Sequence, residues 1–153
     1  MWGFHNAEAG KIVASHRFRV SEAAALLGVS DDTIRRWADS GRFAVSRAPG
    51  GRLVIDGADL APFAQEIAEE SRLGEAFPLP RSSTRNRFTG IVTGVVRDTV
   101  MAQVEVQAGR YRIVSLMSRE AADELGLETG SVVVAGVKAT NVTIDVPQTS
   151  GDE

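Results

Sequence analysis

The spacing of apolar residues changes close to residue 80, and this change divides the chain into two modules of different fold class. Before that point, apolar residues such as Ile34 and Trp37 recur at helical intervals. From Phe88 onward they alternate with polar residues, as in the segment 100–106, which is typical of half-buried strands. Phe77-Pro78-Leu79-Pro80 marks the boundary, because each proline disfavours helix in the residue before it. The 153 residues therefore predict an α+β chain of two small domains.

Composition excludes several classes of protein. The chain has no cysteine, which excludes disulfides and thiolate metal sites and fits a reducing cytosol. It has two histidines, His5 and His16, so a zinc or iron centre is not expected. No apolar run is long enough to cross a bilayer, and no signal-peptide pattern occurs at the start. We therefore expect a cytoplasmic protein with no membrane partner.

The first module has the pattern of two short helices joined by a tight turn. Ser21 and Ser30 are good N-caps for the two helices, and Gly28 provides the turn between them. A Pro-Gly-Gly sequence at 49–51 lies between two short β-prone segments and predicts a hairpin. Asp56 is then expected to cap a third helix. Residues 16–56 contain seven arginines and five acidic residues, which leaves this stretch with a net charge of +2.

This order of elements, over about residues 18–67, resembles the winged helix-turn-helix module of the MerR and excisionase families. The resemblance is carried by Val20-Ser21-Glu22-Ala23-Ala24, Leu27-Gly28-Val29-Ser30, Thr33-Ile34-Arg35-Arg36-Trp37, Gly41 and Pro49-Gly50-Gly51-Arg52. It implies that the second helix enters the major groove of double-stranded DNA. The DNA-contacting residues that it implies are Ser30, Thr33, Arg35, Arg36, Arg47 and Arg52. A solvated basic face is the alternative for any one arginine, whereas the whole set favours DNA.

The second module has the pattern of a small β-barrel. Strands are expected around 91–96, 100–106, 111–117, 131–138 and 142–146, with a short helix that begins at Ser118. Five short strands with one helix after the third predict an OB-like barrel.

This second stretch, about residues 82–145, resembles the molybdate-binding Mop domain of the TOBE group. The resemblance is carried by Ser83-Thr84-Arg85-Asn86, Gly90-Ile91-Val92, Val100-Met101-Ala102-Gln103-Val104, Ser118, Leu125-Gly126-Leu127, Gly130 and Val137-Lys138-Ala139-Thr140-Asn141-Val142. It implies molybdate as the ligand, and tungstate, which is nearly isosteric, should also bind. The implied oxyanion-binding residues are Ser83, Thr84, Arg85, Asn86, Ser118, Ala121, Lys138, Ala139 and Thr140.

The chemistry of these residues fits a tetrahedral dianion that only accepts hydrogen bonds. Arg85 and Lys138 would neutralise its charge, and the Ser83 hydroxyl would add a donor. Ser118 stands at an expected helix start, where free N–H groups favour an anion. Ala139 would let its backbone N–H approach closely. Taken singly, Arg85 is explained at least as well by a surface salt bridge and Lys138 by a solvated strand end, whereas the two together favour a site.

In Mop-type domains the oxyanion lies between subunits, so the resemblance implies a homo-oligomer, a dimer or higher and possibly a hexamer. Ser83, Arg85, Lys138 and Ala139 would come from one chain, and Ser118 with its neighbours from another. Ala121 stands where the family often has a second hydroxyl, so contact at this position is expected from the backbone or at a weaker subsite.

These patterns predict a flexible arm at 1–15, a winged helix-turn-helix domain at 16–72, a linker at 73–81, an oxyanion-binding domain at 82–146 and a disordered tail at 147–153. The favoured function is a transcription regulator that senses molybdate or tungstate. The alternative is a molybdate storage or homeostasis protein whose first module serves assembly or tethering. No enzyme is expected, because the sequence has no nucleophile with a base, no suitable carboxylate pair and no phosphate-cradling glycine loop.

Overall fold

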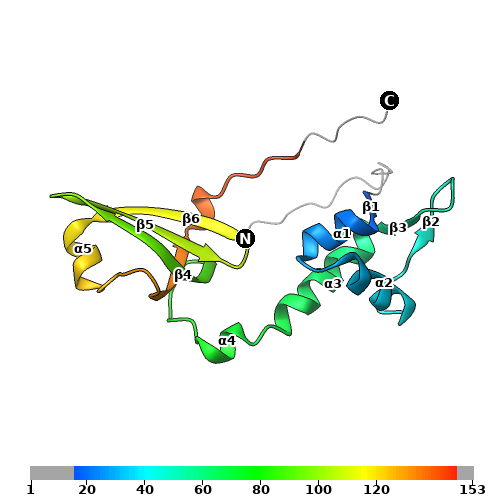
Figure 1. Ribbon diagram of the computed structural model, residues 1–153, viewed down its shortest axis with the longest axis horizontal. Coiled ribbons are helices and arrows are strands. Elements are labelled where there is room, and N and C mark those ends of the chain that lie inside the picture. The colour runs from blue at the N-terminus through cyan, green and yellow to red at the C-terminus, as the bar shows by residue number, and fades with distance from the viewer. Residues whose placement is uncertain (1–15, 148–153) are drawn as a thin grey trace, which may run out of the picture. The chain divides into compact units, whose positions relative to one another are not determined.

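The computed structural model describes residues 16–147, which form two compact units divided between Ser71 and Arg72 (Figure 1). The expected arm at 1–15 lies outside the described residues, as does the expected tail beyond residue 147. Within residues 16–147, no helix has the length and apolar character needed to cross a membrane.

The first unit is a three-helix domain with a small sheet. Its elements are β1 (Arg17–Arg19), α1 (Val20–Leu27), α2 (Asp31–Asp39), β2 (Ser46–Arg47), β3 (Leu53–Asp56) and α3 (Gly57–Glu69). The three strands are antiparallel in the order β1-β3-β2. The predicted helix, helix, hairpin, helix order is therefore observed.

Local signals explain where α2 and the turn before it lie. Gly28 adopts a left-handed φ of 69°, which ends α1 without the steric penalty that a Cβ would bring. The hydroxyl of Ser30 accepts a hydrogen bond from the Thr33 N–H at 3.2 Å and caps α2. The helix-turn-helix arrangement is confirmed, and so is Ser30 as a cap.

The prediction that Ser21 caps α1 is wrong. β1 runs up to Arg19, and α1 begins at once with Val20, so that Ser21 is the second residue of the helix. The first turn is held instead by Glu22, whose carboxylate accepts from the Arg19 N–H at 2.7 Å. A strand that continues directly into a helix leaves no free position for a serine cap.

The core of this unit joins all three helices to the central strand. Ala23 on α1, Ile34 on α2 and Ile55 on β3 are fully buried, and Phe63 on α3 packs with them. Burial of an isoleucine or phenylalanine side chain contributes about 1.5–3 kcal/mol relative to exposure. This core fixes how α2 and the β2–β3 hairpin are placed relative to each other.

The hairpin between β2 and β3 forms at the predicted Pro-Gly-Gly sequence. The Ala48 N–H donates to the Arg52 carbonyl at 2.9 Å, and the Gly51 N–H donates to the Ala48 carbonyl at 2.9 Å. Gly50 and Gly51 both have positive φ, 97° and 82°, a region that other residues rarely adopt. The turn therefore needs its glycines.

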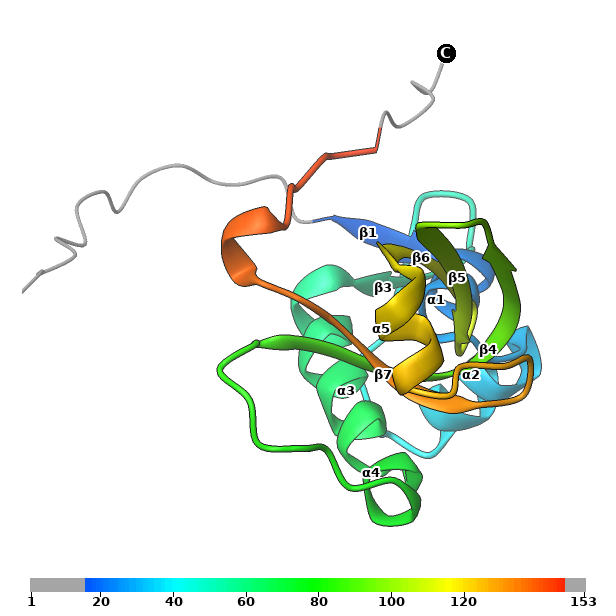
Figure 2. The same ribbon diagram turned by 90° about the vertical axis from the view of Figure 1, so that its left-hand side faces the viewer.

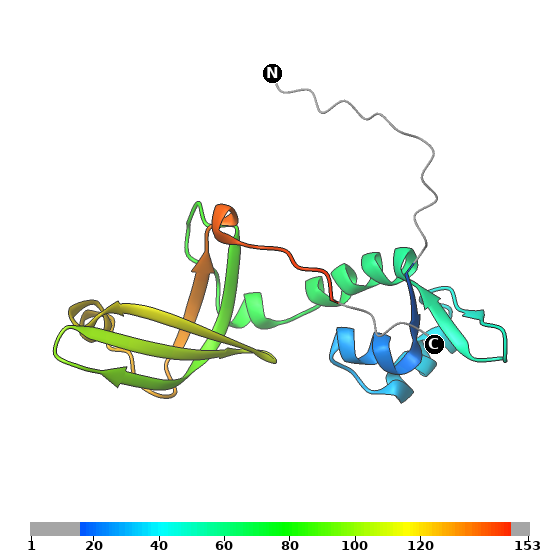
Figure 3. The same ribbon diagram turned by 90° about the horizontal axis from the view of Figure 1, so that it is seen from above.

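The second unit is a four-stranded, curled antiparallel sheet with a short helix (Figures 2 and 3). Its elements are α4 (Leu73–Ala76), β4 (Asn86–Arg97), β5 (Met101–Ala108), β6 (Tyr111–Ser118), α5 (Arg119–Glu124), β7 (Val132–Val137) and the 3-10 helix η1 (Ala139–Asn141). The strand order is β6-β5-β4-β7. The long strand β4 pairs with β7 along its first half and with β5 along its second half.

Two features of β4 explain its curl. A register shift between Val92 and Gly94 interrupts its pairing with β5, and such irregularities increase local twist. A Cβ at Gly90 would lie 2.6 Å from the Gln107 carbonyl oxygen, so that only glycine fits where β4 passes close to β5. The alternating residues Ala102, Val104 and Val106 of β5 are buried inside the curled sheet, as their period predicts.

The prediction of a fifth strand at 142–146 is wrong for the single chain. These residues pair with no strand, and Val142, Ile144 and Val146 are 43%, 85% and 83% exposed. A strand forms only where a neighbour accepts and donates its backbone hydrogen bonds, and no neighbour within residues 16–147 does so. The four strands therefore leave the sheet open rather than closed into a five-stranded barrel.

Candidate functional site

The pairing of β4 with β7 brings two of the predicted oxyanion segments together. Asn86, the first residue of β4, is paired with Val137, the last residue of β7. The Asn86 side-chain amide donates to the Val137 carbonyl at 3.2 Å and links the two strand ends further. The segment 83–85 therefore leads into β4 at the same end of the sheet where the segment 138–140 follows β7. Residues about fifty positions apart in the sequence share one end of the sheet.

The cations at this end of the sheet are free to bind an anion. Arg85 and Lys138 are exposed, and neither side chain forms an ion pair or hydrogen bond with another residue of the range 16–147. The backbone amides of Ala139 and Thr140 also donate to no described residue, because the first hydrogen bond of η1 runs from the Asn141 N–H to the Lys138 carbonyl at 2.9 Å. Two cations and two amides are thus available to an oxyanion.

The loop before β4 is held in place by local contacts. The Thr84 N–H donates to the Ser82 hydroxyl at 3.1 Å. A Cβ built at Gly136 of β7 would lie 3.2 Å from the Thr84 methyl carbon, so the loop passes close over that glycine. Ser83 forms no hydrogen bond within the described part of the chain, which leaves its hydroxyl free as a donor. These contacts fix the loop without using the predicted ligand groups.

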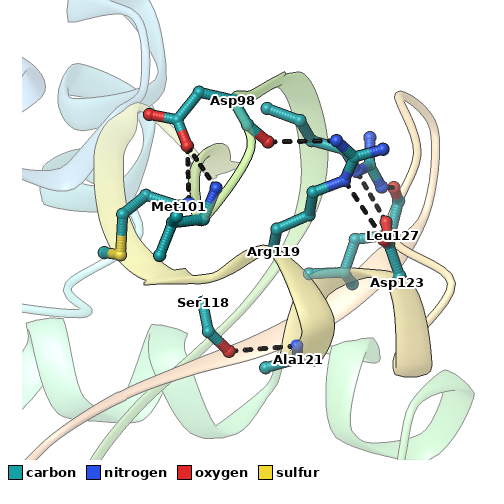
Figure 4. Close-up of polar contacts among 9 residues, drawn as sticks. Asp98, Met101, Ser118, Arg119, Ala121, Asp123 and Leu127 are labelled. Carbon is teal, nitrogen blue, oxygen red and sulfur yellow. Dashed lines mark hydrogen bonds and ion pairs between the residues drawn. The ribbon is translucent and has the colours of Figure 1, made fainter.

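The other predicted oxyanion residues, Ser118 and Ala121, lie at the opposite end of β4. Ser118 ends β6 and caps α5, and its hydroxyl accepts from the Ala121 N–H at 3.1 Å (Figure 4). The following amide, that of Arg119, donates to the Val100 carbonyl at 2.8 Å, next to the turn that follows β4. A single chain therefore does not bring Ser118 and Ala121 to the group that contains Arg85 and Lys138. In a single chain, moreover, the Ala121 amide is already used by Ser118.

The surroundings of Ser118 are partly acidic. A hollow of about 570 Å³ beside it is lined by Glu120, Asp123 and Glu124 but by one cation, Arg119. Arg119 lies 3.5 Å from an Asp123 oxygen, so much of its charge is compensated within the helix. This hollow would repel an anion more than attract one. Arg85 and Lys138, whose side chains have no ion-pair partner within residues 16–147, thus lie at the start of β4 and not at α5.

Asp98 organises the turn next to Ser118. Its carboxylate accepts from the Met101 and Val100 N–H groups at 2.7 Å each, and its carbonyl accepts from the Arg119 side chain at 3.1 Å (Figure 4). The hydrogen bonds from Met101 and Val100 hold the pKa of Asp98 below its ordinary value. The negative form of Asp98 is thus a structural part of the β4–β5 turn.

In the first unit, three of the predicted DNA-contacting arginines converge on one hollow. Arg35 of α2, Arg47 of β2 and Arg52 of the hairpin line a hollow of about 390 Å³ together with Arg19 of β1 and the acidic Asp31. The side chains of Arg19, Arg35 and Arg52 form no ion pair within residues 16–147. The Arg47 guanidinium donates to the Gly51 carbonyl at 2.8 Å, which orients it across the hairpin. This concentration of positive charge suits a phosphate of a nucleic acid backbone.

The remaining predicted DNA-contacting residues have other surroundings. Ser30 and Thr33 contact each other, with 2.9 Å between their hydroxyl oxygens, and hold the N-terminus of α2. Arg36 is exposed on α2 and does not line the arginine hollow. Arg19, by contrast, was not predicted. The alternation of Arg17, Phe18 and Arg19 on β1 was the signal that could have placed it beside the hairpin, because β1 pairs with β3.

Comparison with known proteins places both units in families. The model of the TOBE domain matches residues 82–144, and the model of the helix-turn-helix domain matches residues 17–67. Molybdenum-pterin-binding protein 2 of Clostridium pasteurianum is 38% identical over 63 residues, which are 40% of this chain and 93% of that protein.

Two solved structures are also similar. MopII from Clostridium pasteurianum is 36% identical, with a TM-score of 0.41, over 43% of this chain and 100% of that one. A structure described as the cytoplasmic molybdate-binding protein ModG, with molybdate bound, is 38% identical, with a TM-score of 0.42, over 44% of this chain and 49% of that one.

The fold and these matches define the chain as a two-module binding protein, with a helix-turn-helix domain followed by a TOBE domain. It belongs to the TOBE-domain family of the Mop molybdenum-pterin-binding proteins, to which its second unit is homologous. Molybdenum-pterin-binding protein 2 is by its name a binding protein, in agreement with the expectation that the chain is not an enzyme.

Proposed function

We propose that the second unit binds molybdate or tungstate, that the first unit binds double-stranded DNA, and that the chain is an oxyanion-responsive transcription regulator. The observation that carries the oxyanion site is the pairing of Asn86 with Val137, which gathers the free donors of Arg85, Lys138, Ala139 and Thr140 at one end of the sheet. Charge-assisted hydrogen bonds of this kind contribute roughly 1.5–3 kcal/mol each. The homologous relative is named a molybdenum-pterin-binding protein, which supports a ligand that contains molybdenum.

The separation of the two predicted groups supports a site between subunits. Ser118 lies at the far end of β4 from Lys138 in one chain, so a second chain would have to supply it to the same anion. We therefore propose a homo-oligomer, a dimer or higher, in which Ser83, Arg85, Lys138 and Ala139 of one copy meet Ser118 of another. A cytoplasmic location is supported by the absence of cysteine and by the relative that is described as cytoplasmic.

The oxyanion site is tested by isothermal titration with sodium molybdate. The double variant Arg85→Ala with Lys138→Ala should lose detectable binding, because both charges that compensate the dianion are removed. Arg110→Ala, which removes an exposed arginine from the β5–β6 turn, is the matched control and should bind normally. Circular dichroism monitors the fold. Undiminished affinity in the double variant, with the fold intact, would contradict the proposed site.

DNA binding is supported by the arginine hollow, which joins Arg19 to the predicted Arg35, Arg47 and Arg52. Arg36 stays a proposed contact on the exposed side of α2, and Ser30 and Thr33 stay proposed contacts at its N-terminus. A gel shift with the DNA upstream of the protein's own gene tests this. Arg35→Ala with Arg36→Ala should lower DNA affinity about tenfold or more and leave molybdate binding unchanged.

A molybdate storage protein is the second candidate. One observation favours it: the 63 matched residues make up 93% of the Clostridium pasteurianum relative, so that protein consists almost entirely of the oxyanion module. The two functions are separated by gel shifts with and without molybdate. Tight, sequence-specific DNA binding that changes with molybdate supports a regulator. Weak DNA binding, together with several anions bound per oligomer, supports storage.

A further inference from the structure

The helix α2 has few anchors in the core of the first unit. Of its nine residues, Ile34 is the one that is buried. One buried side chain fixes where a helix lies but leaves its orientation to other contacts. The half-buried Trp37 is the next apolar residue on the same face, and it packs against the core. Because Trp37 directly follows Arg35 and Arg36, its position decides where these two proposed DNA contacts point.

The indole of Trp37 lies against α3 and beneath a cation. Its ring centroid is 5.1 Å from that of Phe63 on α3, in an edge-to-face arrangement. The guanidinium carbon of Arg42 lies 5.5 Å from the Trp37 ring centroid and 4.9 Å from the Phe63 ring centroid. The Arg42 N–H also donates to the Trp37 carbonyl at 3.0 Å, in the turn that follows α2. Arg42 therefore connects the end of α2 with α3.

Two carboxylates of α3 hold the Arg42 side chain over these rings. The Arg42 Nη2 lies 2.8 Å from the Glu66 Oε1 and 3.3 Å from the Glu70 Oε1. Glu66 is in the last turn of α3, and Glu70 is the C-cap of that helix. The charge of Arg42 is thus compensated within the first unit, whereas the side chains of Arg19 and Arg35 have no ion-pair partner within residues 16–147. Arg42 is therefore not suited to be a phosphate contact itself.

We propose that Arg42 is a positioning residue for DNA binding, which fixes Trp37 and thereby the direction of the DNA-facing side of α2. This inference rests on the proposed DNA binding by the first unit. Exposed ion pairs contribute little to stability, so the main effect of Arg42 is on the orientation of α2 and not on the free energy of unfolding. Groups that recognise a ligand need supporting residues of this kind, because small errors in their direction weaken binding.

Arg42→Gln tests the positioning role by fluorescence anisotropy with the DNA upstream of the protein's own gene. Circular dichroism confirms that the variant is folded. We expect the Kd for DNA to rise about tenfold, because the contact with both rings is lost. The slope of log affinity against log salt should stay at the wild-type value, since no phosphate contact is removed. An unchanged Kd would overturn the proposal. A slope lowered by about 0.9 would also overturn it, because Arg42 would then be a phosphate contact.

Glu66→Gln and Glu69→Gln form a matched pair that separates geometry from net charge. Both substitutions remove one negative charge from an exposed residue in the last turn of α3. An effect of net charge alone would strengthen DNA binding equally in the two variants. Only Glu66→Gln removes the 2.8 Å contact with Arg42, so it should bind DNA about fivefold more weakly than Glu69→Gln. Equal affinities of the two variants would contradict the positioning role.

The fluorescence of Trp37 tests the same link without DNA. The chain has two tryptophans, so Trp2→Phe leaves Trp37 as the only one. In this background, Arg42→Gln should raise the acrylamide quenching constant of Trp37 about twofold, because the cation no longer covers the ring. The measurement is made well below the unfolding transition of both proteins. A role in stability alone would leave the quenching of the folded protein unchanged, and that result would contradict the proposed link.

The outcomes also distinguish this inference from the proposed function. A wild-type protein that binds no DNA contradicts the proposed DNA binding and the positioning role together. A wild-type protein that binds DNA, with an Arg42→Gln variant that binds equally well, contradicts the positioning role alone. Weaker DNA binding by Arg42→Gln, together with stronger quenching of Trp37 and an unchanged salt slope, supports the positioning role.

Discussion

At the scale of single residues, the availability of a cation distinguishes the start of β4 from the rest of the sheet. Arg112 donates two hydrogen bonds to the Glu105 carboxylate, at 3.0 and 2.6 Å, and Arg97 donates to Asp123 at 3.0 Å. Arginines that are paired in this way have little charge left for an external anion. Arg85 and Lys138 have no such partner among residues 16–147. A count of charges in the sequence could not distinguish the paired arginines from the unpaired cations.

Gly136 offers a sensitive test of the oxyanion loop. In Gly136→Ala the new Cβ would lie 3.2 Å from the Thr84 methyl carbon, which forces the loop before β4 to shift by a few tenths of an ångström. We expect molybdate affinity to fall about tenfold with little change in stability, because the shift displaces Arg85 and Ser83. Thr84→Ser removes the methyl group, so the double variant should recover the affinity in the same titration. A double variant as weak as Gly136→Ala would contradict this reading of the loop.

Arg19 is a proposed phosphate contact that the structure suggests and the sequence analysis missed. Arg19→Ala should weaken DNA binding and lower the slope of log affinity against log salt by about 0.9, the value for one lost phosphate contact. Arg17→Ala is the matched control, because Arg17 is exposed on the same strand and does not line the arginine hollow. Fluorescence anisotropy over a series of salt concentrations measures both slopes. Equal slopes for the two variants would contradict a contact between Arg19 and a DNA phosphate.

At the scale of elements, the parts that local signals determine were predictable, and the parts that depend on pairing were not. Ser30 and Asp56 cap their helices as expected, with the Asp56 carboxylate 3.0 Å from the Ala58 N–H. Pro-Gly-Gly forms the expected hairpin. Ser21 failed as a cap because β1 leads directly into α1, and Arg19 was missed because its position depends on the pairing of β1 with β3. The segment 142–146 has the alternating pattern of a strand but pairs with no strand among the described residues, because a pattern does not specify a pairing partner.

The hydrogen bonds in the β4–β5 turn lead us to expect that the stability of the protein falls at low pH. Hydrogen bonds from the Met101 and Val100 N–H groups lower the pKa of Asp98 below its ordinary value of 3.8. Because the folded-state pKa is the lower one, the contribution of Asp98 to stability is fully present above pH 3.8 and is lost as the pH falls through the folded-state value. Chemical unfolding at pH values from 6 to about 2 should show this loss.

Asp98→Asn is the control for that dependence. It keeps the size of the side chain but has no carboxylate to protonate, so the variant should be less stable than wild type at neutral pH. The difference should shrink below the folded-state pKa of Asp98. Glu105, whose pKa the Arg112 guanidinium also lowers, still titrates in the variant and gives it a residual pH dependence. A difference between the two proteins that stays constant down to the lowest pH would contradict the role of the Asp98 charge.

At the scale of the whole molecule, regulation requires that the oxyanion site and the DNA interface be coupled through the assembly. The two proposed sites lie in separate units of the chain, so coupling between them would have to pass through the proposed oligomer or the connector between the units. An anion held between subunits would stabilise the oligomer, which sets the spacing of paired DNA-binding helices. Coupling of this kind is reciprocal: if molybdate changes DNA affinity by a given factor, DNA changes molybdate affinity by the same factor.

Lys138→Ala separates this coupling from DNA binding itself. In the wild type, we expect molybdate to change the affinity for operator DNA about 5- to 150-fold, the range of typical coupling free energies. In Lys138→Ala this change should disappear, while the DNA affinity without molybdate stays at the wild-type value, because Lys138 lies in the second unit and the arginine hollow lies in the first. Anisotropy titrations with and without sodium molybdate measure both quantities. A molybdate effect that persists in the variant would place the sensing site elsewhere. If Lys138→Ala binds DNA more weakly than the wild type in the absence of molybdate, Lys138 itself contributes to DNA binding.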